Sequence, residues 1–166
     1  MQIIRDRRIS ESHWRHVPDG ALADAKGTKL PGAIIVALAD WRYHKSELLC
    51  RGTPVGVRLD AGNDVDEIVD DLDRIALVAL EFASATDGRA YTYARILRER
   101  HGYQGEIRAV GDVSRDRLAF MERCGFNACE LRSDCGLDDA LNAFGEISDV
   151  YQPAADARPV IASRRA

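Results

Sequence analysis

The stretch from Ile75 to Leu131 constrains the fold most, because strand-like and helix-like segments alternate there with few connecting residues. The segments typical of strands are Ile75–Phe82, Glu106–Val110 and Asn127–Leu131. The segments with helical spacing are Asp87–His101 and Ser114–Cys124. A near-continuous apolar run such as IALVALEF is typical of a parallel strand that is covered on both faces. The alternation therefore predicts a parallel sheet with right-handed helical crossovers.

The same alternation begins further upstream. Ala33–Leu38 and Pro54–Leu59 are predicted strands, and Asp64–Arg74 is a predicted helix with a strongly acidic composition. Between the two strands, Asp40 can cap a helix and Gly52 can end it in a left-handed conformation. The chain is thus predicted to be an α/β protein with a mostly parallel sheet of about five βα units flanked by helices. An open, doubly wound sheet is the first choice and a partial barrel is the alternative, because strand order is not visible in a sequence.

The sequence also predicts the extent of the domain and the segments at its periphery. Residues 1–153 are expected to form a single α/β domain, followed by a flexible C-terminal tail over residues 154–166. The predicted peripheral segments are a strand or hairpin over Met1–Ile9 with a turn at Asp6 and Arg7, a packing anchor at Trp14, a loop over Asp19–Gly32, a last helix over Gly136–Gly145 and a closing strand over Ser148–Tyr151.

Composition restricts the classes of partner. The chain has 166 residues and a formal net charge of −4, which gives no reason to expect nucleic acid or a membrane surface as a partner. No apolar run approaches the roughly 18 residues of a membrane-spanning helix. The first ten residues, MQIIRDRRIS, carry charges where a signal peptide needs an apolar core, which favours a cytoplasmic location.

Motifs for metals and cofactors are missing. The four cysteines, Cys50, Cys124, Cys129 and Cys135, have no CxxC spacing, and free thiols are the favoured interpretation. The sequence contains neither a nucleotide-binding glycine fingerprint nor a zinc-protease or hydrolase motif. The acidic helix could suggest a divalent metal, but a solvated face is favoured because no calcium-loop glycine accompanies it. No metal site is predicted, and the motifs predict no cofactor.

Charged residues at the predicted strand ends form the first candidate site. In parallel α/β proteins the site lies beyond the carboxyl ends of the strands, and there the sequence places Arg58, Glu81, Arg108, Asp112 and Glu130. One interpretation is a buried, self-neutralising network in which Arg108 lies between two carboxylates. The other is a catalytic site in which Glu81 or Glu130 acts as a general base and Arg108 clamps an anion.

The second candidate site is the helix start at Asp87, Gly88 and Arg89. Free backbone N–H groups there would attract an anion, and Arg89 would add a bidentate contact. Alternatively, Asp87 occupies those N–H groups itself as a cap. Arg95 and Arg98 follow on one predicted helical face, beside Arg89 or Arg100 depending on the exact register. This arginine-rich face would be solvated, dock an acidic partner protein or bind an anion.

The densest run of these residues resembles a known family. The segments that carry the resemblance are Asp87–Tyr91, Arg95–Arg100, Gly105–Val113, Arg115–Asp116, Arg123–Phe126 and Tyr151–Ala154. They resemble the bacterial domain-of-unknown-function family 934, and the resemblance extends from the amino-terminal strand to Pro153. At Cys129 the family commonly has an aromatic residue, which argues against a family-wide role for that thiol.

Membership would place the protein in sulfur metabolism. Family members are often labelled as oxidoreductases, and their genes commonly lie beside those for sulfite reductase. The resemblance therefore implies an accessory protein of assimilatory sulfite reduction that docks to sulfite reductase or supports its electron supply. In this interpretation Arg89, Arg95 and Arg98 would meet the partner. The alternative is a small enzyme that binds an oxyanion substrate at the strand ends. The family has no established catalytic residues. The sequence also contains no catalytic motif that would support the oxidoreductase label.

Overall fold

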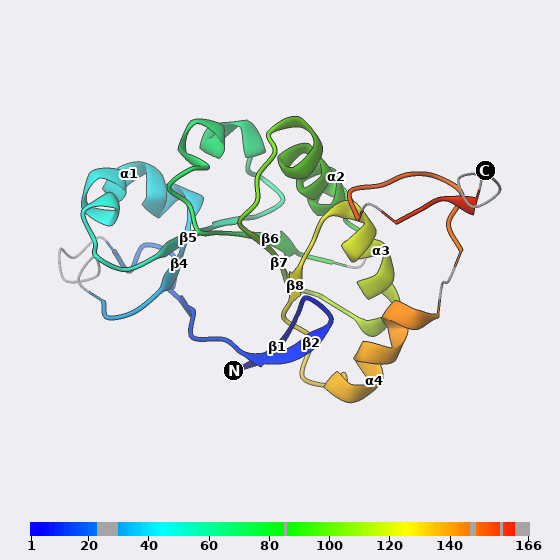
Figure 1. The fold of residues 1–166 in the computed structure, drawn as a ribbon. Coiled ribbons are helices and arrows are strands. Elements are labelled where there is room, and N and C mark those ends of the chain that lie inside the picture. The colour runs from blue at the N-terminus through cyan, green and yellow to red at the C-terminus, as the bar shows by residue number, and fades with distance from the viewer. Residues whose placement is uncertain (23–29, 85, 147–148, 157, 162–166) are drawn as a thin grey trace.

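The computed structural model, which describes residues 1–22, 30–84, 86–146, 149–156 and 158–161, contains one eight-stranded sheet (Figure 1). Its strands are β1 (Gln2–Arg5), β2 (Arg8–Glu11), β3 (Arg15–His16), β4 (Ile34–Ala37), β5 (Val55–Leu59), β6 (Leu77–Phe82), β7 (Glu106–Gly111) and β8 (Ala128–Cys129). The order across the sheet is β2-β1-β8-β7-β6-β5-β4-β3. Strands β3 to β8 are parallel, whereas β1 pairs antiparallel with both β8 and β2.

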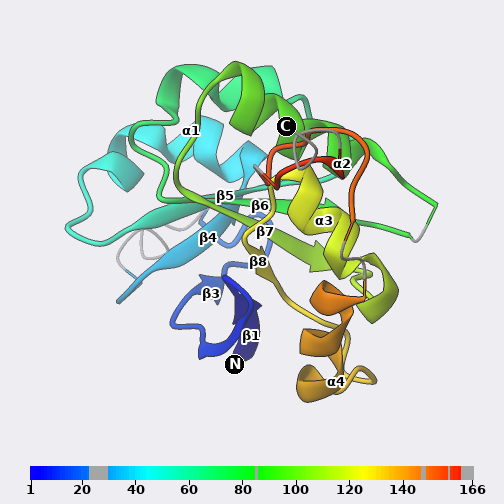
Figure 2. The same cartoon turned by 45° about the vertical axis from the view of Figure 1, so that its right-hand side comes forward.

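The helical segments connect these strands. They are α1 (Leu38–Leu49), η2 (Val65–Asp71), α2 (Arg89–Arg95), η3 (Ile96–Arg100), η4 (Arg115–Arg117), α3 (Leu118–Cys124), α4 (Leu137–Asn142) and η5 (Ala143–Gly145). Figures 1 and 2 show α1, α2 and α3 on the same side of the sheet. Because consecutive parallel strands are neighbours, the strand order never reverses. The doubly wound arrangement is therefore wrong, and the prediction of about five units is also wrong because the described sheet has eight strands. The strand order is consistent with the alternative of a partial barrel.

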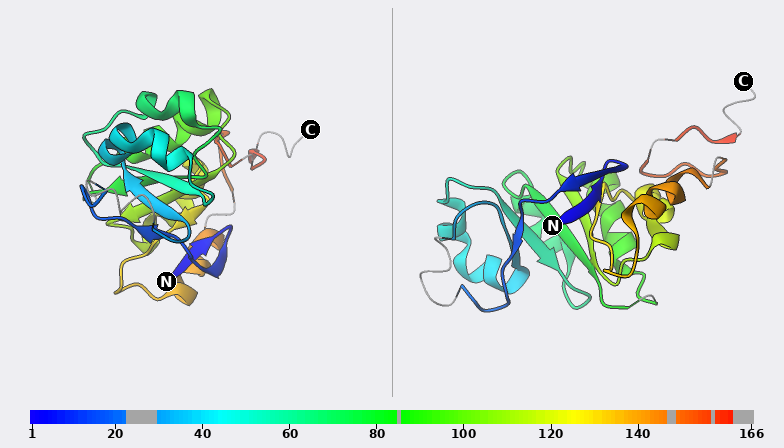
Figure 3. Two further views of the ribbon diagram at one scale, coloured as in Figure 1. Left: turned by 90° about the vertical axis from the view of Figure 1, so that its left-hand side faces the viewer. Right: turned by 90° about the horizontal axis from the view of Figure 1, so that it is seen from below.

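The sheet curls into a half-barrel. Edge strands β2 and β3 would lie about 34 Å apart in a flat sheet of this size, at about 4.8 Å per strand. Only Ser12, His13 and Trp14 separate them in sequence, and the four steps from Glu11 to Arg15 span about 14 Å at most. The segment Ser12–Trp14, which we call the strap, therefore crosses the open side of the sheet. Figure 3 shows the N-terminal hairpin on this side, seen from below.

Alternate residues of each strand face the helices or the concave side, as the period of a strand requires. In β6, Val78, Leu80 and Phe82 belong to the main core beneath the helices. Leu77 and Ala79 pack instead on the concave side, where the ring of Trp14 covers them. The strap thereby covers a second, smaller apolar cluster on the concave side.

The predicted turn at Asp6 and Arg7 is confirmed. β1 and β2 form a hairpin whose turn residues Asp6 and Arg7 have φ values of 50° and 59°, as a tight two-residue hairpin turn requires. Gly102 and Gly125, which follow the two helices of the central stretch, have φ values of 63° and 109°. Glycine takes this conformation without the steric penalty of a side chain.

Other local predictions are wrong. Asp40 does not cap α1, because the helix already begins at Leu38, and the buried Asp40 side chain accepts a hydrogen bond from Gly20 N at 3.2 Å. Gly52 has no positive φ. Asp149–Tyr151 forms no strand, and the remainder of that prediction, Ser148, lies outside the described residues.

The segment predicted to be a flexible tail makes defined contacts where it is described. Ala155 N donates to Arg123 O at 3.1 Å, and Asp156 pairs with Arg123 at 3.4 Å, which holds this segment against α3. Residues 157 and 162–166 of the predicted tail lie outside the described part of the chain.

Candidate functional site

Side chains from distant strands converge at the carboxyl ends of the parallel strands. They surround a pocket of about 210 Å³ that opens on the concave side and that we call the mouth. Its lining residues are His16, Arg58, Glu81, Val110, Gly111 and Glu130. In curled parallel sheets this edge is where ligands and substrates bind, because the loops and the strand ends meet there.

His16 and Glu130 bridge the concave side. Nε2 of His16 lies 3.0 Å from each carboxylate oxygen of Glu130. His16 belongs to β3 and Glu130 follows β8, so four strands separate them in the sheet, and only the curl brings them together. The His16 side chain is 34% exposed and the Glu130 side chain 15% exposed, so this pair faces the mouth without being fully solvated.

The buried Arg108 holds Glu130 in position. Nη1 of Arg108 donates to Glu130 Oε1 at 2.7 Å and to Ser12 Oγ at 3.0 Å, while its Nε donates to Glu106 Oε1 at 2.6 Å. Nη2 lies 2.5 Å from the same Glu106 oxygen but outside hydrogen-bonding geometry. Burial acts to raise the pKa of Glu130, but the hydrogen bonds and charges of His16 and Arg108 lower this pKa overall. Glu130 is thus kept ionised and fixed in position.

Arg58 supplies the cation at the mouth. Its Nε lies 3.3 Å from Glu81 Oε2, and its Nη2 donates to Asp19 Oδ1. The Arg58 side chain is 24% exposed, whereas Arg108 is completely buried. Arg58 can therefore reach a ligand.

Gly111 shapes the wall of the mouth. It has a φ of 86°, and a Cβ atom at this position would lie 2.5 Å from Phe82 O. The neighbouring Asp112 N donates to that same oxygen at 2.8 Å, which brings β6 and β7 close together. The Asp112 carboxylate pairs with Arg132 Nη1 at 3.0 Å and is not part of the mouth.

Only some of the predicted strand-end residues line the mouth. Glu81 and Glu130 both line the mouth, but Asp112 does not. Arg108 lies between two carboxylates, which are Glu106 and Glu130 rather than Glu81 and Glu130. Because Arg108 is buried and paired, its assignment as an anion clamp is wrong, and the interpretation as an ion network fits it.

His16 was not among the candidates because nothing in the sequence marks it. Strand β3 has only two residues, which is too short for a periodic pattern. Its place opposite Glu130 depends on the strap and on the curl of the sheet. The only sequence signal was the neighbouring Trp14, a large aromatic side chain in a polar segment.

The helix start at Asp87 is already occupied. Asp87 Oδ1 accepts from Arg89 N at 3.1 Å, and its carboxylate pairs with the Arg89 guanidinium at 2.8 Å. The hydrogen bonds from Arg89 hold the pKa of Asp87 below its usual value. Gly88 precedes a helix of only seven residues. The N-cap of α2 is Gly88, which makes no side-chain cap hydrogen bond, so Asp87 is not the cap residue itself. Asp87 nevertheless occupies the Arg89 N–H and the Arg89 guanidinium, which an anion bound there would need.

The predicted arginine-rich face is wrong. Arg95 pairs with Glu99 at 2.9 Å on the surface. Arg98 turns inward, where its Nε donates to Gly125 O at 3.0 Å and its Nη1 to Gly105 O at 2.9 Å. The α-helical spacing fails because the helix continues as a π-helical turn, η3, from Ile96 onward.

The remaining candidates serve the fold. Asp64 caps η2 in a capping box with Glu67, and Asp71 pairs with Lys45 at 2.6 Å. Within the described part of the chain, no group of three His, Cys, Asp or Glu side chains could hold a metal ion. Cys124 and Cys129 are buried free thiols. No helix among the described residues combines the length and the apolar character that crossing a membrane requires.

Comparisons with known proteins give one match. The family model described as "Bacterial protein of unknown function (DUF934)" matches residues 56–161. No curated protein and no solved structure matches the chain. The matched region includes Arg58, Glu81 and Glu130 of the mouth, whereas His16 and the strap precede it.

Proposed function

The chain belongs to the DUF934 family, and from this premise we propose that it serves assimilatory sulfite reduction by binding a small oxyanion at the mouth of the half-barrel. The observation that carries the proposal is the convergence of His16, Arg58, Glu81 and Glu130 in one pocket. The link to sulfite reduction rests on the family resemblance.

The size of the mouth favours a ligand of few atoms. Pockets for drug-sized ligands have volumes of about 300–1,000 Å³. At about 210 Å³ the mouth is smaller, which fits a tetrahedral or pyramidal oxyanion such as sulfite with some ordered water.

The side chains of the mouth have complementary roles in this proposal. Arg58 would donate two hydrogen bonds to the anion, in exchange for its present contact with Asp19. His16 would contact the ligand through Nδ1, which makes no hydrogen bond within the described part of the chain. Glu130 would hold the His16 ring in place, as an orienting carboxylate does in acid–base sites.

The charge balance predicts that a proton accompanies the anion. Three arginines on the concave side, Arg5, Arg58 and Arg108, are matched by three glutamates, Glu81, Glu106 and Glu130, and Asp19 adds a fourth carboxylate that pairs with Arg58. A bound anion would therefore add negative charge to this site, which favours the entry of a proton together with the anion. We expect sulfite binding to take up a proton, which is measurable as a binding enthalpy that changes with the ionisation enthalpy of the buffer.

Titration calorimetry with sulfite tests the proposal. We expect saturable binding to the wild type and at least a tenfold weaker affinity for Arg58→Gln. Arg132→Gln is the matched control, because it removes an exposed arginine that pairs with Asp112 outside the mouth. Absence of binding to the wild type, or equal affinity of the Arg58 variant, would refute the proposal.

Docking to sulfite reductase is the second candidate, and an exposed aromatic side chain favours it. Phe120 on α3 is 54% exposed and packs edge-on against Tyr91 of α2 at a centroid distance of 5.0 Å. Aromatic side chains at a protein surface are enriched in interfaces. Co-purification of tagged protein with sulfite reductase at low salt would support this role if Phe120→Ser reduces the recovery. Equal recovery with Phe120→Ser, or no recovery of sulfite reductase at all, would exclude this surface.

A further inference from the structure

Glu81 lines the mouth with a carboxylate that accepts no hydrogen bond from the described part of the chain. Nε of Arg58 lies 3.3 Å from its Oε2, outside hydrogen-bonding geometry. An ionised carboxylate has about four acceptor positions on its two oxygens. Both oxygens of Glu130, in contrast, lie 3.0 Å from His16 Nε2, and one of them also accepts a hydrogen bond from Arg108 at 2.7 Å. Glu81 is therefore an acceptor of the mouth that remains available to a ligand.

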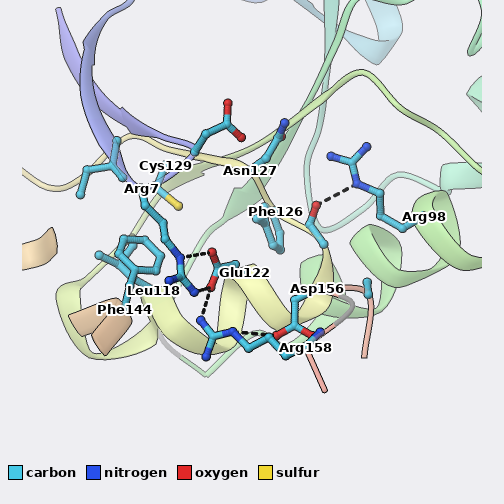
Figure 4. A pocket seen from close by; sticks show the side chains of 14 residues that line it. Arg7, Arg98, Leu118, Glu122, Phe126, Asn127, Cys129, Phe144, Asp156 and Arg158 are labelled. Carbon is cyan, nitrogen blue, oxygen red and sulfur yellow. Dashed lines mark hydrogen bonds and ion pairs between the residues drawn. The ribbon is translucent and has the colours of Figure 1, made fainter. Parts of the chain in front are cut away.

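A pocket on the helix-facing side of the sheet shows the opposite arrangement. This pocket has a volume of about 310 Å³, and its three arginines match its three carboxylates in number, namely Arg7, Arg98 and Arg158 against Asp6, Glu122 and Asp156. Arg7 donates to both oxygens of Glu122 at 2.6 and 2.7 Å, and Arg158 donates to one of them at 2.6 Å. Figure 4 shows both guanidinium groups meeting at Glu122. Glu122 is thus a carboxylate that the protein itself uses, in contrast to Glu81.

The space beside Glu81 is kept open by Gly111. Glu81 and Phe82, at the end of β6, pair with Val110 and Gly111 at the end of β7. A Cβ atom added to Gly111 would already lie 3.4 Å from Glu81 Cγ, so a larger side chain there would occupy the space beside the carboxylate. The side chains of Glu81 and Arg58 are 32% and 24% exposed. A small ligand can therefore contact the carboxylate and the guanidinium together.

The charges of the mouth disfavour an anion that brings no proton. The lining contains one arginine, Arg58, and two carboxylates, Glu81 and Glu130. Asp19, which also pairs with Arg58, is 68% exposed and can move away, but Glu81 belongs to β6 and stays beside Arg58. A fully ionised anion at Arg58 would place its oxygens against the Glu81 carboxylate with no hydrogen atom between the acceptors, which costs free energy. A hydroxyl group on the anion removes this repulsion by donating to Glu81.

We propose that Glu81 selects, among oxyanions, those that carry a hydroxyl group. This inference rests on the proposed function, because it concerns the ligand of the same mouth. Hydrogen sulfite and hydrogen phosphate carry such a hydroxyl near neutral pH, whereas sulfate is fully ionised there. Arg58 binds the charged oxygens of the ligand, and the hydroxyl donates to Glu81. The proton that enters with the anion then lies between the ligand and Glu81 rather than on His16.

Titration calorimetry with sulfite, inorganic phosphate and sulfate tests the proposal. Sulfate and phosphate have nearly the same size and shape, but only phosphate carries a hydroxyl near neutral pH. The wild type should bind sulfite and phosphate at least about tenfold more tightly than sulfate, because an anion without a hydroxyl leaves the acceptor unpaired. Glu81→Gln should bring the affinities for sulfate and phosphate within about threefold of each other, since an amide both donates and accepts hydrogen bonds.

A control variant and a proton count make the test specific. Glu99→Gln is the matched control, because Glu99 also pairs with an arginine, Arg95, but lies outside the mouth, and it should keep the wild-type selectivity. Titrations in buffers of different ionisation enthalpy, at a pH where free sulfite is mainly the dianion, count the protons taken up. The wild type should take up a proton with sulfite, and Glu81→Gln should take up less.

The outcomes separate this inference from the proposed function. Equal affinities of the wild type for sulfate and phosphate would overturn the inference while sulfite binding at the mouth stands, and so would an unchanged selectivity of Glu81→Gln. Rejection of phosphate together with sulfate would assign the selectivity to the shape of the anion and would also overturn the inference. If the wild type binds no sulfite, the proposed function itself fails, and this inference fails with it.

Discussion

Among single residues, Arg108 shows most clearly how a buried charge is used. It is completely buried between Glu106 and Glu130, so its removal would leave two carboxylates without their cation. We expect Arg108→Met to lower the free energy of unfolding by about 3–5 kcal/mol. Arg95→Gln, which breaks an exposed pair with Glu99, should change it by no more than about 0.5 kcal/mol. Equal urea midpoints of the two variants would contradict the ion-network interpretation.

The lowered pKa of Glu130 predicts a dependence of stability on pH. A carboxyl group with a lower pKa in the folded state stabilises the protein fully above its unfolded pKa of about 4.3, and this contribution is lost as the pH falls through the folded value. Compared with the wild type, Glu130→Gln should therefore be less stable at neutral pH, and the difference should shrink below about pH 4.3. Urea unfolding from pH 3 to 7 measures this difference, and a constant gap would contradict the prediction.

The sequence was informative about which single residues carry charge at strand ends, but not about their partners. Glu81, Arg108 and Glu130 could be located because each lies in or directly after an apolar run. The partners His16 and Asp19 depend on register and curl, which no local pattern encodes. Glu106, in contrast, lies two residues before Arg108 in the same strand and therefore shares its face. Arg98 was misplaced because a single π-helical turn rotates it away from the predicted face.

At the scale of elements, the end of β7 determines the shape of the mouth. Gly111 has a positive φ, and a Cβ atom added to it would lie 2.5 Å from Phe82 O, which is closer than these atoms can approach. Gly111→Ala should therefore lower the free energy of unfolding by about 1–3 kcal/mol. Gly52→Ala is the control, because Gly52 lacks a positive φ and a Cβ atom added there would have no other atom within 4 Å; we expect a change within about 0.5 kcal/mol. Thermal unfolding of both variants measures the difference, and similar losses would refute this role of Gly111.

For the whole molecule, the strap is the segment that makes a half-barrel of the sheet. The strands themselves were predictable from apolar runs, but their order was not, because a doubly wound sheet and a half-barrel use the same alternation of strands and helices. The antiparallel strands β1 and β2 beside β8, and a strap of three residues to β3, have no signature beyond turn residues and Trp14.

Closure by the strap has a measurable consequence. Trp14→Ala should lower the free energy of unfolding by about 2–4 kcal/mol, because Trp14 covers Ile35, Leu77, Ala79 and Val110 on the concave side. Tyr43→Ala removes an aromatic ring that is 86% exposed and should have an effect within about 0.5 kcal/mol. If both variants unfold at the same urea concentration as the wild type, the strap does not stabilise the half-barrel.

A crystal structure of the protein with sulfite tests the central claim most directly. The account predicts one bound anion in the mouth, within hydrogen-bond distance of the Arg58 guanidinium and of His16 Nδ1, with Asp19 displaced from Arg58. The mouth would retain its pair between His16 and Glu130. An empty mouth at a saturating sulfite concentration, or an anion bound only outside the mouth, would contradict the account.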